Sequence, residues 1–301
     1  MLIGHTESRF IPPSKNKEHM QSLDSAVTRK RLCTVLGPSG SGKTALVSYW
    51  ARTREQRAGC NPQEFPLFIT LPRGDDKTPI EYTLLLRLYR ALHRAAGTEY
   101  LLRQRKWREK YTRYSQRNLE YIDLQVAEML DQMPICAVVI DNAHELNASA
   151  FDRALTLRTF YHEREGQKVR RALILVAKKE ANDPEHTLTE LLTETPEALA
   201  AHGESINLSL LTKKDLLTTL TELIDEELHT IFSPAIEPDL DKIGKELHEF
   251  TRRNWHTFEN FINNLDIALG ERTDNRRRVI TREVLDEAKR LTAAQRRDGQ
   301  G

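Results

Sequence analysis

Short apolar runs alternate with amphipathic segments through the first two thirds of the chain. A short continuous apolar run predicts a strand buried on both faces, whereas apolar positions three and four residues apart predict a helix. The predicted strands cover residues 32–36, 65–71, 135–141, 172–177 and 206–208. The predicted helices between them cover residues 16–31, 43–55, 78–97, 119–133 and 148–164.

The last third of the chain has a helical pattern throughout. Helices are predicted at residues 212–229, 236–250, 255–270 and 281–293. Strands that alternate with helices form a parallel sheet sandwiched by helices, so this order predicts an α/β core followed by a helical lid. We assign residues 1–16 to an N-terminal tail, 17–211 to the core, 212–295 to the lid and C-terminal helix, and 296–301 to a basic flexible tail.

The first predicted strand runs into the octapeptide GPSGSGKT, which fits the phosphate-binding pattern G-x-x-x-x-G-K-[ST]. Its glycines let backbone N–H groups face the phosphates, and the following helix adds the positive end of its dipole. Lys43 is expected to reach the β- and γ-phosphates, and the Thr44 hydroxyl to bind Mg²⁺. The predicted nucleotide-binding residues are Gly37, Pro38, Ser39, Gly40, Ser41, Gly42, Lys43 and Thr44.

A second nucleotide signature closes the apolar strand at 135–141. Its last residue, Asp141, is predicted to bind Mg²⁺ together with Thr44. Many ATPases of this kind place a glutamate next, whereas Asn142 follows here; asparagine orients a water but accepts no proton at physiological pH. We therefore expect slow hydrolysis, with a nearby carboxylate as a partial substitute. The predicted catalytic residues are Lys43, Asp141, Asn142 and Glu145.

A possible sensor and a possible arginine finger are the two further features that concern the γ-phosphate. Lys178 follows an apolar strand, where a polar sensor normally stands, although a lysine just past a strand is often merely exposed. No arginine occurs from residue 172 to residue 251, so an arginine finger, if the protein has one, should come from elsewhere. Arg153, Arg158 and Arg164 are candidates, and each is equally well a solvated helix charge.

Composition and charge narrow the class of protein. Charged residues make up 30% and hydrophobic residues 39% of the 301, and no apolar run reaches the roughly 18 residues of a membrane helix. The N-terminus has no signal-peptide core, so we expect a cytoplasmic protein without a membrane partner. The net charge is +1, but residues 100–117 are strongly basic and residues 180–204 strongly acidic.

The order of strands, phosphate loop, Asp141 and helical lid resembles an AAA+ ATPase of the P-loop NTPase class. Within that superfamily the chain resembles transposon-encoded target-selection regulators of the TnsC/TniB type, including those of CRISPR-associated transposons. The resemblance is carried by residues 4–12, VIDNAHEL at 139–146 against the family's IIDEAHxL, LVA at 175–177, and the lid at 255–291.

The resemblance implies ATP and Mg²⁺ as cofactors and a homo-oligomer, as a ring or a helical filament, on double-stranded DNA. Such an assembly recruits a transposase and a TniQ/TnsD-like target selector. The lid arginine that usually senses the nucleotide is replaced by His256. A different class also stays open, namely a STAND-like AAA+ signalling ATPase that oligomerises to recruit a protein effector without binding DNA.

DNA contacts in this family come from the loop after the second strand and from the region after the next helix. Repeated Lys and Arg residues there suit backbone phosphates rather than base edges. Alternatively, the interleaved aromatic residues pack inward and the cations form a solvated face. The predicted DNA-binding residues are Arg73, Lys77, Arg103, Arg105, Lys106, Trp107, Arg108, Lys110 and Arg113.

Overall fold

The computed structural model describes residues 16–57, 65–72, 79–95, 119–132, 135–162, 167–179, 188–226, 230–270 and 278–298. Contacts divide the chain into two compact units. The first unit includes the described residues of 18–37 and 50–207, and the second includes those of 38–49 and 208–298. No helix in the described ranges is both long enough and apolar enough to cross a membrane.

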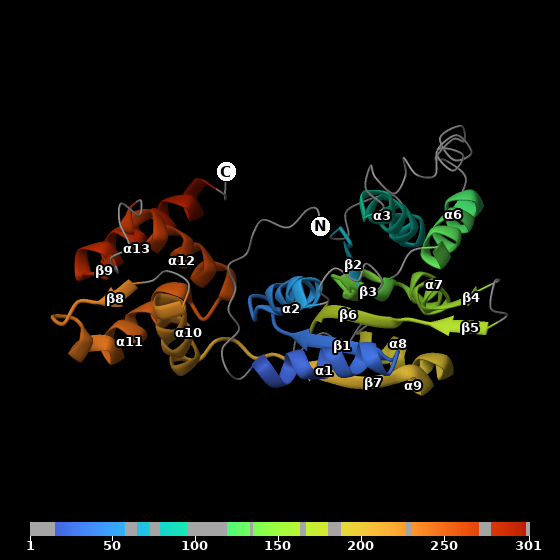
Figure 1. Cartoon of the computed structure of the whole chain (residues 1–301), viewed down its shortest axis with the longest axis horizontal. Helices are drawn as coiled ribbons and strands as arrows, with labels where there is room; N and C mark the ends of the chain where they lie inside the picture. The colour runs from blue at the N-terminus through green and yellow to red at the C-terminus, as the bar shows by residue number, and fades with distance from the viewer. Residues whose placement is uncertain are drawn as a thin grey trace. The chain divides into compact units, whose positions relative to one another are not determined.

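The first unit is built on a five-stranded parallel sheet with the order β2-β3-β6-β1-β7 (Figure 1). All neighbouring strands are parallel, so each connection crosses over the sheet, as parallel pairing requires. The central strands are buried along nearly their whole length, which explains their unbroken apolar runs. The strands are β1 (Leu32–Gly37), β2 (Phe65–Thr70), β3 (Ile135–Asp141), β6 (Ala172–Lys178) and β7 (His202–Asn207).

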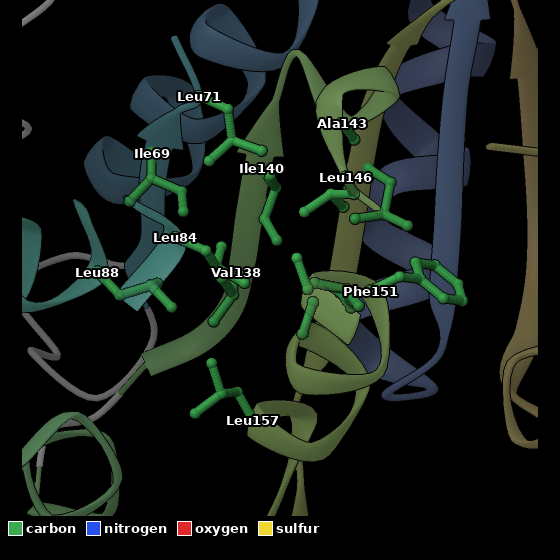
Figure 2. Packing of buried hydrophobic residues seen from close by; sticks show 14 of the residues in the cluster. Ile69, Leu71, Leu84, Leu88, Val138, Ile140, Ala143, Leu146, Phe151 and Leu157 are labelled. Carbon is green, nitrogen blue, oxygen red and sulfur yellow. The ribbon is translucent and has the colours of Figure 1, made fainter. Parts of the chain in front are cut away.

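Helices α3 (Ile80–Ala95), α6 (Leu119–Gln132) and α7 (Ala148–Arg158) share one hydrophobic core with the sheet. Figure 2 shows this packing, in which Leu84 and Leu88 of α3 and Phe151 and Leu157 of α7 flank the strand residues. Leu88 and Phe151 are fully buried. Two short helices, α8 (Leu188–Glu194) and α9 (Pro196–Ala201), add residues to the same core.

Helix α1 (Asn16–Thr28) and the later part of α2 (Lys43–Arg57) form a separate contact in the first unit. Trp50 donates its indole N–H to Asp24 Oδ1 at 2.9 Å, and Arg54 Nη1 donates to the same oxygen at 2.9 Å. Alternate residues of β1, Cys33 and Val35, are buried outside the core just described and therefore face the other side of the sheet. The sheet is thus covered on both faces.

The second unit is mainly helical after residue 208. It contains α10 (Lys213–Glu226), the 3-10 turn η2 (Glu237–Asp239), α11 (Leu240–Thr251), α12 (Trp255–Leu269) and α13 (Arg282–Asp298), with the short parallel strands β8 (Thr230–Phe232) and β9 (Arg278–Ile280). The last two helices pack together through the buried Asn264, which donates to Thr292 Oγ1 at 3.0 Å. Glu246 of α11 accepts from Lys289 of α13 at 3.0 Å, which fixes a third helix to the pair.

The parallel α/β fold with a following set of helices confirms the predicted fold class. One helix was predicted wrongly: α7 ends at Arg158 instead of residue 164, and the chain continues as an antiparallel hairpin of β4 (Thr159–His162) and β5 (Gln167–Arg170). Thr159, Phe160 and Tyr161 are β-branched or aromatic, so they favour a strand over a fourth helical turn.

The other differences concern segments with weak patterns. The last strand of the sheet begins at His202, whereas the sequence predicted a start at residue 206. The start was missed because this edge strand has alternating burial and no continuous apolar run. Helices α8 and α9 and the short strands β8 and β9 were not predicted. Helix α13 continues to Asp298, so residues 296–298, which were assigned to a flexible tail, are helical.

Candidate nucleotide-binding site

The carboxyl ends of three strands meet at one edge of the sheet. Val176 of β6 pairs with Val35 of β1 on one side and with Asp141 of β3 on the other. Two residues further along these strands, Gly37 of β1 pairs with Lys178 of β6. Ligands of open parallel sheets bind at the carboxyl edge, so Asp141, Lys178 and the loop that follows Gly37 all start from the edge where a nucleotide is expected.

The phosphate loop has the backbone geometry that its glycines predict. Gly40 and Gly42 have φ angles of 80° and 85°, in the left-handed region that residues with a side chain seldom adopt. The helix begins directly afterwards, and Leu46 N donates to Gly42 O at 2.8 Å. Backbone N–H groups in such a loop, together with the helix N-terminus, form a binding place for an anion.

The residues of the loop fit a nucleotide triphosphate. Lys43 Nζ donates to Pro38 O at 2.8 Å, so the cation already lies against the loop. Ser41 is buried, and its hydroxyl oxygen has no hydrogen-bond partner among the described residues. A buried polar group without a partner is costly in a loop that binds nothing. Thr44 follows Lys43 in the first turn of α2, the position from which its hydroxyl would bind Mg²⁺.

Asp141 and Asn142 form a compact turn after β3. Asp141 is 5% exposed, and its Oδ1 accepts the backbone N–H of Asn142 at 2.9 Å. Asn142 has a φ of 58°, a left-handed conformation that asparagine tolerates well. Its side-chain Nδ2 donates to Leu71 O at 2.9 Å, just beyond β2. The amide at the position of the missing glutamate therefore also fixes the ends of two neighbouring strands.

Glu145 and Lys178 are connected through His144. The 3-10 turn η1 (Ala143–Glu145) follows Asn142, and Glu145 Oε1 lies 3.5 Å from His144 Nε2. The other ring nitrogen of His144 accepts the backbone N–H of Lys178 at 3.3 Å. The side chain of Lys178 is exposed at the end of β6. The structure thus brings Asp141, Glu145 and Lys178 to the same edge of the sheet.

Two of the three arginine-finger candidates have partners within the chain itself. Arg158 is 8% exposed; its Nε donates to Arg171 O at 3.1 Å, and its Nη2 to Lys30 O, directly before β1. This location is the amino end of the sheet, and both hydrogen bonds hold the guanidinium group within its own chain. Arg153 forms an ion pair with Asp123 of α6. Arg164 lies outside the described residues.

The lid approaches the phosphate loop at the start of α12. Asn254 caps this helix, because its Oδ1 accepts from His256 N at 2.9 Å and from Thr257 N at 3.4 Å. The backbone N–H of Trp255 donates to Gly40 O at 2.7 Å. His256, which stands where the nucleotide-sensing arginine is expected, is exposed in the first helical turn. The sequence indicated His256 but not the two residues before it.

The predicted DNA-binding residues cannot be placed. Arg73 and Lys77 belong to the segment 73–78, and the basic residues from Arg103 to Arg113 belong to the segment 96–118. Both segments lie outside the described residues, so DNA binding stays a prediction from the sequence.

A phosphate loop between a buried strand and a helix, with an acid-ended strand two places away in a parallel sheet, defines a P-loop nucleotide-binding protein. More narrowly, a family model described as an AAA domain matches residues 27–183, just over half of the chain. The chain therefore belongs to this family of ATPase domains. The match covers both the phosphate loop and Asp141.

Solved structures share the fold at low sequence identity. The Aeropyrum pernix ORC2 protein in its ADPNP–ADP complexes has a TM-score of 0.59 and 16% identity, covering 94% of this chain and 70% of that chain. The Aeropyrum pernix ORC1 protein in complex with DNA has a TM-score of 0.56 and 12% identity, and the match covers 96% of this chain and 67% of that chain. Cdc6p from Pyrobaculum aerophilum has a TM-score of 0.56 and 15% identity, and the match covers 86% of this chain and 64% of that chain. A comparison with curated proteins gave no match.

Proposed function

We propose that this chain is an ATP-dependent regulator that oligomerises on double-stranded DNA and links target selection to transposase recruitment. The observation that carries the nucleotide part is the phosphate loop, with left-handed Gly40 and Gly42, the buried Ser41 hydroxyl and Lys43 on the loop itself. Thr44 and Asp141 would hold Mg²⁺, which screens the phosphate charge when it is bound. Lys178 and His256 complete the proposed nucleotide contacts.

Hydrolysis is proposed to be slow. Lys43 would stabilise the charge on the transferred phosphoryl group, and Asn142 would orient a water without taking its proton. Asn142 already donates its amide to Leu71 O, and Glu145 lies near His144, so neither is a dedicated base. A long-lived triphosphate state suits a switch that must persist until its partners have assembled.

The DNA part of the proposal is supported by the basic sequence of residues 100–117 and by the resemblance to transposon regulators. This chain shares its fold with an ORC1 protein whose structure was solved with DNA, and that likeness is compatible with DNA binding. The proposed partners are duplex DNA, further copies of this chain, a transposase and a TniQ/TnsD-like selector.

Sedimentation of the full chain with duplex DNA tests this function. We expect co-sedimentation in Mg·ADPNP, little in ADP, and a steep loss as salt rises, because released counterions drive phosphate contacts. Arg105, Lys106 and Arg108 changed together to Ala should lower DNA binding while nucleotide binding persists. The matched control is Arg87, Arg90 and Arg94 of α3, also changed together to Ala.

Nucleotide-dependent oligomers that form equally with and without DNA would contradict the DNA part and favour the effector-recruiting alternative. A chain that coats DNA equally without nucleotide would contradict the switch. Analytical ultracentrifugation separates these outcomes, because it measures oligomer size and DNA occupancy in one sample.

A further inference from the structure

The turn that joins α11 to α12 has an unusual backbone. Arg252 and Arg253 are consecutive and have φ angles of 50° and 62°. A left-handed conformation costs a residue with a side chain on the order of 1–2 kcal/mol. Only two other non-glycine positions among the described residues have a positive φ, Lys30 and Asn142. Strain of this kind persists where the surrounding structure requires it.

The turn presents Asn254 and Trp255 to the phosphate loop. Besides the hydrogen bond from Trp255 N to Gly40 O, both side chains pack against glycines. A Cβ atom on Gly42 would lie 3.1 Å from Trp255 Cγ, and one on Gly40 would lie 2.6 Å from Asn254 Nδ2. The absence of a side chain at Gly40 and Gly42 therefore leaves space for Asn254 and Trp255, and it also allows the left-handed backbone.

Trp255 is also the first member of an aromatic row inside the lid. Its side chain is 5% exposed and meets the edge of Phe258, with ring centroids 5.7 Å apart. Phe258 stacks on Phe261 at 6.3 Å, and Phe261 meets Phe250 of α11 at 6.4 Å. Because close-packed interiors transmit strain, a displacement at Trp255 would reach Phe250 of the neighbouring helix α11 through this row.

We propose that Trp255 and Asn254 are positioning residues that hold the phosphate loop and transmit its nucleotide state to the lid. The inference rests on the proposed nucleotide binding. In a trans peptide the Gly40 carbonyl and the Ser41 N–H point in opposite directions. The Trp255 bond to that carbonyl therefore sets the direction of the Ser41 N–H, and rotation of this peptide toward a phosphate changes the bond to the lid.

This arrangement differs from a sensor that reaches the nucleotide with a charged side chain. His256 is exposed and its Nε2 lies 3.4 Å from the amide of Asn260, one turn further along α12. Trp255 instead acts through a main-chain hydrogen bond and through contact with Gly42. The lid thus responds to the shape of the loop, and the loop responds to the phosphates.

Intrinsic fluorescence during titration with Mg·ADPNP tests the proposal, because Trp255 is one of three tryptophans in the chain. Isothermal calorimetry measures binding independently. We expect a saturable emission change whose midpoint equals the calorimetric midpoint. This change should be lost in Trp255→Phe and retained in the control Trp50→Phe, a position that takes no part in the proposed binding sites. Binding without an emission change, or a change that persists in Trp255→Phe, would overturn the proposal.

Nucleotide affinity supplies the second readout. Trp255→Ala should weaken Mg·ADPNP about tenfold, a usual size for coupling between sites, whereas Trp255→Phe keeps the ring contact and the N–H and should stay near the native value. If the alanine variant does not fold, Trp255→Leu takes its place. A Trp255→Ala affinity equal to native would overturn the positioning role. Absence of calorimetric binding by the native chain would instead remove the proposed function itself, and the inference with it.

Discussion

Single residues at the phosphate loop and at the end of β3 combine two tasks. Gly40 and Gly42 give the loop its left-handed turns and leave space for Asn254 and Trp255. Asn142 occupies the position of a catalytic glutamate, yet its amide connects β3 to the backbone of Leu71. Substitutions at these positions therefore need readouts that separate nucleotide chemistry from stability.

Asn142→Glu is expected to raise ATP turnover, because a carboxylate accepts the proton of the attacking water and an amide does not. The same change removes the hydrogen bond to Leu71 O and places a less suitable residue at a positive φ, so stability should fall by about 1 kcal/mol. Phosphate release and urea unfolding measure the two effects. An unchanged rate in a folded variant would show that water activation at this position is not limiting.

Arg252→Gly is expected to stabilise the lid by about 1 kcal/mol, because glycine adopts the left-handed conformation after a helix without a steric cost. Arg252 caps the end of α11 with a φ of 50°. Burial and, to a smaller extent, the nearby charge of Arg252 lower the pKa of the Arg296 guanidinium. Thermal unfolding should show a higher midpoint. The control is Lys245→Gly in the middle of α11, where glycine should destabilise by a similar amount.

At the scale of elements, two buried arginines fasten the amino end of the sheet. Arg171 is 3% exposed and donates Nε to Ile135 O at 3.0 Å and Nη2 to Leu130 O, so it joins the end of α6 to the start of β3. Arg158 joins α7 to the residues before β1 and β6. Burial lowers the pKa of both guanidinium groups, but the carbonyl contacts compensate for the lost hydration.

Arg171→Lys is expected to destabilise the first unit by about 2–3 kcal/mol, because an ammonium cannot reproduce the fork that contacts two separate carbonyls. Arg170→Lys, at the neighbouring exposed position, is the matched control and should have little effect. Urea unfolding followed by circular dichroism compares them. Equal midpoints for the two variants would contradict the fastening role.

The sequence predicted those elements whose patterns are strong. Unbroken apolar runs marked β1, β3 and β6, and the octapeptide located the loop, because both patterns have direct physical causes. The hairpin β4–β5 was missed because the helical spacing of α7 carries on past Arg158 in the sequence, and the edge strand β7 because it lacks an apolar run.

The site could be predicted from the sequence only in part. Residues 37–44 and Asp141 carry a recognisable local signature, whereas the contact of Trp255 with Gly42 joins positions more than two hundred residues apart. An asparagine before a helical pattern, as at Asn254, indicates a helix cap. The pattern does not indicate that Asn254 packs against the phosphate loop. The partners of Arg158 likewise follow from tertiary packing alone.

For the whole molecule, two half-buried histidines predict a loss of stability in mild acid. Burial lowers the pKa of His93, on α3 beside Tyr89, and of His202, at the start of β7. The unfolded chain then binds more protons than the folded chain below about pH 6.5, so stability falls as the pH drops through 6.5 toward the lower folded values.

Urea midpoints at pH 7.5 and pH 5.5 measure this dependence. His93→Phe keeps an aromatic ring against Tyr89 and should reduce the difference between the two midpoints, whereas His256→Gln, at an exposed position, serves as the control. A pH dependence that is identical in native protein and His93→Phe would show that His93 does not contribute.

Calorimetric titration of the full chain with Mg·ATP tests the central claim most directly, because every proposed step begins with a triphosphate held by residues 37–44. We predict one nucleotide per chain for native protein. We also predict a loss of binding in Lys43→Ala, while Lys30→Ala, outside the loop, binds normally. Equal binding by native protein and a folded Lys43→Ala variant, or no binding by either, would contradict the account.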